Sequence, residues 1–264
     1  MTKLNFLRST KGWISKLQGV LDRGTCQMVL NVAASNASIG LATHMWNTMK
    51  TVYRYPATTE AYGAMIHAFG EASLKHDSPE DADYSMLAAL LELEEQGAGQ
   101  ASIGLQRLVA SYLSTSPERT DSAFFLLCDF HEEWLQGKKS DDSNDSTKDA
   151  PAPSSSDRCE QVRKVYVSAL NAIIRACALQ NSIGRAFSTF EEIRTTFGLE
   201  PDLGSYNALL EACSQRQTPE GLTAFALLED IKKTKGLEPD AESYHLTLLA
   251  LVRSGLRMQA SFHG

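Results

Sequence analysis

Residues 186–202 read AFSTFEEIRTTFGLEPD and residues 224–240 read AFALLEDIKKTKGLEPD, so the same pattern returns after 38 positions. In each copy the apolar residues fall three or four positions apart, as they do on one face of a helix. Glycine and proline then close both copies at the same place, because glycine suits the turn after a helix and proline prevents the helix from continuing. A helix that recurs with an identical closure indicates a tandem repeat.

A second amphipathic helix precedes each copy. Residues 170–174 read LNAII and residues 206–210 read YNALL, 36 positions apart. Leu170, Ile173, Ile174 and Cys177 share one helical face, which predicts a buried stripe. Each unit is therefore expected to be a helical hairpin, and the two spacings differ because a loop absorbs two extra residues. The predicted units are 169–202 and 205–240, with a partial unit at 243–264.

The amino-terminal half repeats the same pattern more loosely. Residues 36–42 read NASIGLA and resemble QNSIGRA at 180–186, 144 positions later, which is four times 36. Apolar spacing predicts further hairpins at 59–96 and 100–136. The expected fold is all-α, a right-handed α-solenoid of helix-turn-helix repeats in which each repeat contacts its neighbours.

Four segments follow from this pattern. Residues 1–24 are basic, with no acidic residue before Asp22, which fits either a mitochondrial targeting peptide or the second helix of a partial repeat. Residues 25–136 are expected to be degenerate helical repeats. Residues 137–160 are acidic and rich in serine and proline, and are expected to form a disordered loop. Residues 161–264 contain the best repeats.

Composition excludes several classes of protein. The net charge of −7 argues against a generally basic nucleic-acid binder, although residues 161–264 carry 11 basic and 11 acidic residues. The five cysteines are scattered without the close pairs that zinc or redox sites need, so we expect reduced thiols, no metal and no cofactor. No deaminase, phosphate-loop or nucleophile-elbow motif occurs, which predicts a protein that is not an enzyme. No stretch approaches the roughly 18 apolar residues that span a bilayer, so no membrane partner is expected.

At the two best units the chain resembles the pentatricopeptide-repeat family. The resemblance rests on an aromatic or apolar residue followed by asparagine near the start of the first helix, an Ala-Phe opening of the second helix, and the Gly-Leu-Glu-Pro-Asp closure. It implies first helices that line a groove for single-stranded RNA, where each repeat presents a few side chains to one base.

The resemblance also implies which residues would contact RNA. In this family a polar residue near the start of the first helix acts with the last residue of the repeat to choose the base. These positions are Asn171 with Asp202, Asn207 with Asp240, and His245 in the partial unit. An Asn and Asp pair implies a preference for uridine. In the weaker units, Met28, Gly63 and Leu105 take the place of the polar residue.

Two interpretations of these residues stay open. The asparagines and aspartates either read bases or serve the helices, the asparagines as caps and the aspartates as the start of the next helix. Accordingly, the chain is expected to be a non-catalytic RNA-binding protein of organellar RNA metabolism, in a mitochondrion or chloroplast, and otherwise cytoplasmic. The alternative is a protein-binding scaffold, or a subunit of a ribonucleoprotein or ribosome, built from related helical repeats.

Overall fold

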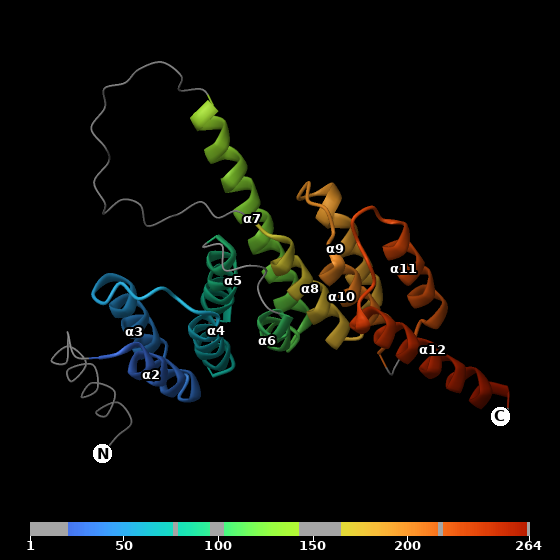
Figure 1. Ribbon diagram of the computed structural model, residues 1–264, viewed down its shortest axis with the longest axis horizontal. Coiled ribbons are helices and arrows are strands. Elements are labelled where there is room, and N and C mark those ends of the chain that lie inside the picture. Colours follow the sequence, from blue (N-terminus) through green and yellow to red (C-terminus); the bar gives the residue numbers. More distant parts are fainter. Residues whose placement is uncertain (1–20, 76–78, 96–102, 143–164, 216–218, 263–264) are drawn as a thin grey trace. The chain divides into compact units, whose positions relative to one another are not determined.

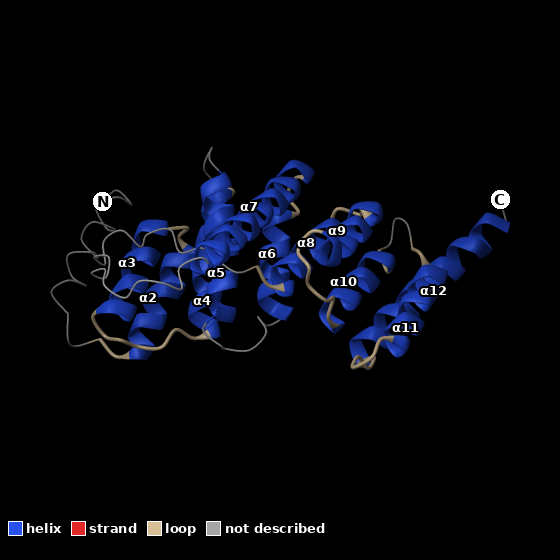
Figure 2. Cartoon of the chain, turned by 90° about the horizontal axis from the view of Figure 1, so that it is seen from above, coloured by secondary structure: helices blue, strands red, loops and turns tan. Residues whose placement is uncertain are grey.

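Helices account for all the regular structure that the computed structural model describes, which covers residues 21–75, 79–95, 103–142, 165–215 and 219–262. These residues form eleven helices and no strand, and Figures 1 and 2 show how the helices follow one another along the chain. The all-α prediction is therefore confirmed. Within each unit consecutive helices pack as hairpins. The predicted hairpin at 100–136 and the right-handed sense of the array stay predictions.

The chain divides into two compact units, Met1–Leu113 and Ser114–Gly264. The first contains α2 (Arg23–Ser35), α3 (Ile39–Thr51), α4 (Thr59–Ser73), α5 (Pro79–Glu95) and α6 (Ile103–Leu113). The second contains α7 (Pro117–Asp142), α8 (Val167–Leu179), α9 (Ile183–Thr195), α10 (Leu203–Cys213), α11 (Gly221–Lys233) and α12 (Ala241–Phe262).

Two of the predicted segments fall mainly on residues that are not described. Of the basic segment 1–24, residues 1–20 lie outside the described part of the chain. The predicted loop 137–160 begins within α7, whose backbone is helical to Asp142, and its residues from 143 onward lie outside the description.

The carboxy-terminal unit is a stack of first helices with second helices beside them. Helix α8 packs on α10, and α10 packs on α12, while α9 and α11 each pack on the first helix of their own hairpin. The predicted apolar stripe of α8 is fully buried, since Leu170, Ile173, Ile174 and Cys177 all have 0% exposure. Phe190 of α9 meets Tyr206 of α10 edge to face at 5.0 Å between ring centres, which joins consecutive hairpins.

Left-handed residues end the helices where the sequence predicts turns. Gly198 and Gly236 have φ of 60° and 89° in the two Gly-Leu-Glu-Pro-Asp closures, a conformation that glycine adopts without strain. Asn181 and Ala37, which lie 144 positions apart in the similar stretches, also have positive φ values of 58° and 51°. The amide of the next residue then bonds back to the helix in both, at 2.9 Å. The two units thus share one type of hairpin turn.

The amino-terminal unit is held by close packing between α4 and its neighbours. Trp46 of α3 meets Tyr62 of α4 edge to face at 4.7 Å. Tyr112 of α6 lies against Gly70 of α4, where a Cβ atom would be 2.3 Å from the tyrosine ring. The Tyr112 hydroxyl also lies 2.5 Å from Nδ1 of His67 and donates to Glu71 at 3.1 Å. Glycine at position 70 therefore lets the two first helices approach each other.

We expect Gly70→Ala to destabilise the protein by about 1–3 kcal/mol, because the new methyl group overlaps a buried ring. The matched control is Gly24→Ala in α2, whose Cβ would make an ordinary contact at 3.6 Å and gain up to about 1 kcal/mol of helix propensity. Both effects are measured by denaturant unfolding followed by circular dichroism. Equal midpoints for the two variants would contradict the packing of Tyr112 on α4.

Candidate nucleic-acid interface

The predicted RNA-contacting residues occupy one repeated position of the first helices. Asn171, Asn207 and His245 are each the fifth residue of their helix, in α8, α10 and α12. Asp202 is the N-cap of α10, and Asp240 directly precedes the first residue of α12. Each predicted aspartate therefore belongs to the start of the next repeat's first helix.

The first pair is joined by a hydrogen bond between repeats. Asn171 donates from Nδ2 to Oδ1 of Asp202 at 3.0 Å. The same carboxylate oxygen accepts from the backbone amide of Ser205 at 2.8 Å, and the Ser205 hydroxyl accepts from the amide of Asp202 at 3.2 Å. These two bonds form a capping box, which satisfies amides that a helix start otherwise leaves unbonded. The asparagine thus holds an already capped helix end.

The second pair repeats this geometry and adds one bond. Asn207 donates from Nδ2 to Oδ1 of Asp240 at 3.2 Å, and Asp240 accepts from the backbone amide of Ser243 at 2.8 Å. The Ser243 hydroxyl lies 2.7 Å from Oδ1 of Asn207. The Asn207 amide therefore has a partner at both of its ends.

Hydrogen bonding also sets the charge state of this cap. Burial raises the pKa of Asp240, but the bonds from the Ser243 amide and hydroxyl and from Asn207 outweigh burial, so the pKa lies below its ordinary value of 3.8. Asp240 is therefore ionised at neutral pH, and an ionised carboxylate also suits the positive end of a helix.

Both asparagines are closed off from solvent. Asn171 has 0% exposure and Asn207 has 1%, whereas His245 is exposed. The structure brings each predicted pair together but leaves no surface of the asparagines for a base to touch. Contact with a ligand therefore requires the adjacent first helices to move.

The capping interpretation is right for the aspartates and wrong for the asparagines. Asp202 caps α10 with its side chain, and Asp240 makes the same bonds to Ser243. Asn171, in contrast, lies inside α8, whose N-cap is Tyr166 without a side-chain bond. The asparagines instead link one repeat to the next.

In the amino-terminal unit the start of α2 corrects one of the predicted positions. Position five is Gln27 in α2, where Met28 was predicted, and Gly63 in α4 is as predicted. Leu105 is only 7% exposed and belongs to the core.

The correct register for α2 was readable from Asp22 and Thr25. The Asp22 side chain accepts from the Thr25 amide at 2.9 Å, which is an N-cap signal. Gln27 then donates from Nε2 to the carbonyl oxygen of Glu60 in the first turn of α4, at 3.3 Å. The link from position five to the next first helix therefore occurs in both units.

Other candidate sites in the described residues are weaker. No group of three or more His, Cys, Asp or Glu side chains there is placed to hold a metal ion. Burial raises the pKa of Cys177 to about 11 and that of Cys213 to about 12, so these thiols stay protonated and pack as small apolar residues. None of the described helices is long and apolar enough to cross a membrane.

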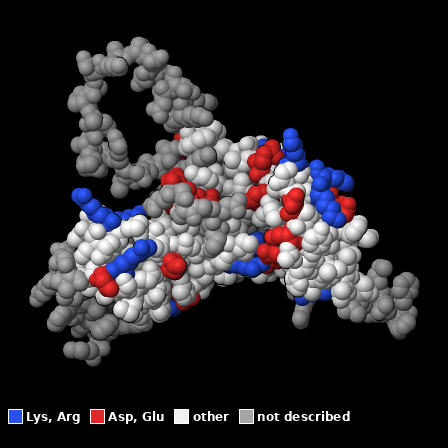
Figure 3. Space-filling model, in the orientation of Figure 1, with Lys and Arg blue, Asp and Glu red and all other residues white. Residues whose placement is uncertain are grey.

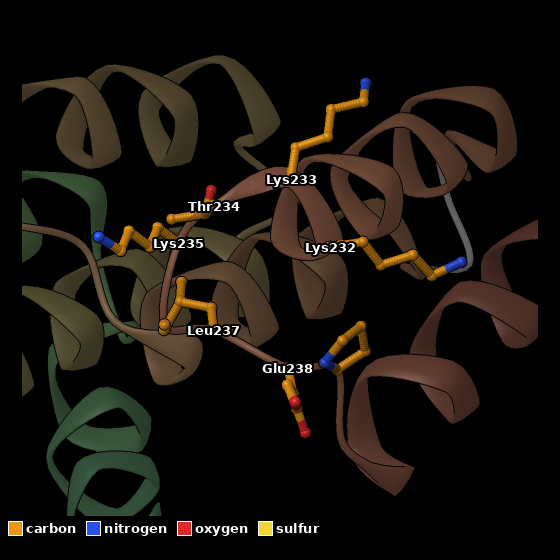
Figure 4. A pocket seen from close by; sticks show the side chains of 8 residues that line it. Lys232, Lys233, Thr234, Lys235, Leu237 and Glu238 are labelled. Atoms are coloured by element: carbon orange, nitrogen blue, oxygen red, sulfur yellow. The ribbon is translucent and has the colours of Figure 1, made fainter.

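A surface hollow of about 610 Å³ lies at the connection between α11 and α12 and is lined by Lys232, Lys233 and Lys235 among others. Figure 4 shows the three lysine side chains pointing in different directions, so they do not converge on one ligand. Figure 3 shows basic and acidic side chains interspersed on the face in view, without a continuous basic surface.

Comparison with known proteins gives a short sequence match. No protein-family model matches the chain. A mitochondrial pentatricopeptide repeat-containing protein of Arabidopsis thaliana is 54% identical over 46 residues, which is 17% of this chain and 7% of that protein. Over those 46 residues the chain is similar to a pentatricopeptide-repeat protein. The matched segment is a small part of both proteins, so the similarity does not extend to the Arabidopsis relative as a whole.

Solved structures of pentatricopeptide-repeat proteins also match. The crystal structure of PPR10 from maize is 17% identical, with a TM-score of 0.32 over 94% of this chain and 45% of that chain. PPR10 in complex with an 18-nucleotide psaJ RNA element matches with a TM-score of 0.31, 17% identity and 44% coverage of that chain. The chain thus spans less than half the length of PPR10.

We expect Asp240→Asn to be less stable than wild type at neutral pH, since asparagine keeps the capping oxygen but loses the charge. Because the folded pKa of Asp240 lies below 3.8, the stabilisation by its charge is present at pH 7 and disappears as the pH falls through that pKa. The difference between the unfolding midpoints should therefore be present at pH 7 and become smaller as the pH is lowered below 3.8.

The control for this comparison is Asp230→Asn, whose carboxylate makes a surface ion pair with Lys233 at 3.5 Å. Such pairs contribute at most about 1 kcal/mol. If the two variants lost equal stability with the same pH dependence, the bonds at Asp240 would not be special.

Proposed function

We propose that the carboxy-terminal unit binds single-stranded RNA without catalysing a reaction, with the pairs Asn171–Asp202 and Asn207–Asp240 contacting bases. The observation that carries this proposal is the fixed orientation of each asparagine by the aspartate of the next repeat, at 3.0 and 3.2 Å. One amide hydrogen is held by the aspartate, so the second is set in a defined direction. A side chain with a set direction discriminates between bases better than a freely rotating one.

The expected preference is for uridine at these two repeats. An asparagine amide both donates and accepts, which suits the edge of a pyrimidine that offers a carbonyl oxygen beside an N–H group. His245 is proposed as a third contact, because it occupies the same helix position and is exposed. Two defined pairs read about two bases, so a longer target needs other contacts.

The comparisons support RNA as the ligand and an organelle as the compartment in this proposal. PPR10 of maize is bound to RNA in its solved complex, and the Arabidopsis relative is named as mitochondrial. We therefore propose a role in organellar RNA metabolism, such as processing, stability or translation.

A protein-binding scaffold is the second candidate, and one surface favours it. Tyr244, Leu248 and Val252 of α12 are 46%, 61% and 58% exposed and lie four positions apart on one face. The equivalent of Leu248 in α10 is Leu210, which has 0% exposure. An exposed apolar stripe is a common feature of protein interfaces.

Binding of fluorescent oligonucleotides separates the two candidates. Wild type should bind a U-rich strand more tightly than an A-rich strand, with an affinity that falls as salt rises. Asn171→Ala with Asn207→Ala should reduce this preference by roughly 1–3 kcal/mol per base. The control is Asn47→Ala, an exposed asparagine of the second helix α3.

Binding to all homopolymers with equal affinity would contradict base reading at these pairs. No binding at low salt would contradict the RNA function itself. In that case, a pull-down in which one protein dominates would support the scaffold, and circular dichroism of each variant checks that it is folded.

A further inference from the structure

Helix α8 carries a row of buried polar side chains that lack partners. Ser168, Asn171 and Arg175 lie three and four positions apart, so they share one face of the helix. Their exposures are 4%, 0% and 1%. Four of their polar atoms have no hydrogen-bond partner, namely the Ser168 hydroxyl, Oδ1 of Asn171, and Nε and Nη2 of Arg175. These three residues are called the polar row below.

The polar row faces α10, as its existing bonds show. Asn171 donates to Asp202 at the start of α10, and Nη1 of Arg175 pairs with Glu211 one repeat later. Gly204 in α10 lies close to the row, since a Cβ atom there would be 3.0 Å from Nδ2 of Asn171. The unpartnered atoms therefore lie next to the junction of the two repeats.

The free atoms of Arg175 form a definite binding edge. Nε–H and Nη2–H lie side by side on one edge of the guanidinium plane, and this fork matches two oxygens of a phosphate or carboxylate. Glu211 occupies the remaining nitrogen, Nη1, and leaves this edge unused. A buried charged group with unused donors is unfavourable, so a ligand that supplies acceptors is stabilised there.

We propose that Arg175 binds a phosphate of the RNA strand whose base contacts Asn171, an inference that rests on the proposed function. Asn171 lies one helical turn from Arg175, so the two side chains are neighbours on one face of α8 and can contact different parts of one nucleotide. The free Oδ1 of Asn171 accepts from a base N–H group, and the fork of Arg175 donates to two phosphate oxygens. The Ser168 hydroxyl is a third contact at the other end of the row.

Access to the polar row requires the same movement that base contact requires. The row is closed in the free protein, so α8 and α10 have to move apart at this junction. Four unpartnered polar atoms destabilise the closed arrangement, which makes that movement less unfavourable here than at a fully bonded junction.

The next repeat lacks the same arrangement, although its Asn and Asp pair is identical. The equivalent positions of α10 are Gly204, Asn207 and Glu211, and those of α12 are Glu242, His245 and Leu249. Both ends of the Asn207 amide are already bonded, and a carboxylate at position 211 repels phosphate. The two repeats that the sequence makes alike are thus expected to contribute unequally.

The test compares Glu211→Gln with the double variant Glu211→Gln plus Arg175→Gln, so that Arg175 is removed without leaving a buried carboxylate. Adding Arg175→Gln to the Glu211→Gln variant should weaken binding to a U-rich strand by about tenfold. It should also reduce the slope of log affinity against log salt by about 0.7, the value for one phosphate contact on a single strand.

An exposed ion pair in the same unit provides the matched control. Arg194 donates from Nε to Glu200 at 3.0 Å, so Glu200→Gln is compared with Glu200→Gln plus Arg194→Gln. The change in net charge is the same, and we expect little effect on affinity or slope. Equal effects of the two comparisons would overturn the proposal and leave buried water as the partner of Arg175.

Two results keep the outcome clear. If the wild type binds no RNA, the proposed function is wrong. If it binds RNA and the affinity does not depend on Arg175, only this inference is wrong. If the double variant does not fold, the RNA affinity of Arg175→Lys tests the inference instead, because lysine keeps the positive charge beside Glu211 but lacks the two-donor edge of arginine. Wild-type affinity of Arg175→Lys would overturn the proposal, and a loss of about tenfold supports it.

Discussion

The junction between consecutive first helices is the constraint on which each unit depends. A helix start leaves several backbone amides unbonded, and in α10 the residue that satisfies one of them is Asp202. That residue is in turn fixed by Asn171 of the repeat before. When α8 packs on α10, the start of α10 is therefore already capped. The apolar stripe of α8 can then be buried without leaving the capped amide of α10 unpaired.

The hairpins were predictable because their signals are local. Apolar residues three and four positions apart predict the buried face of α8, and the Gly-Leu-Glu-Pro-Asp closures predict the left-handed turns at Gly198 and Gly236. The similarity of residues 36–42 to 180–186 likewise corresponds to one type of turn, with Ala37 and Asn181 both at positive φ. Each of these features depends on neighbours within a few residues in the sequence.

The site was predictable only in part, because its chemistry depends on burial across repeats. Identical Asn and Asp pairs do not reveal that Ser243 closes the Asn207 amide while Oδ1 of Asn171 stays without a partner. Nor does an arginine in α8 reveal that one of its edges is unused, because Glu211 lies 36 positions away. The error at Met28 arose because apolar spacing alone set the register, whereas the cap formed by Asp22 fixes the start of α2.

The capping box at α10 also bears on how such repeats can be exchanged between proteins. A segment cut at 169–202 keeps Asn171 with Asp202 but leaves behind Ser205, which completes the box. In a chimaeric protein that receives this segment, the host sequence would supply the residue three positions after the aspartate, in the first turn of the following helix. The unit that transfers intact is therefore longer than the unit that repeats, and modular assembly has to carry the first turn of the following helix with each repeat.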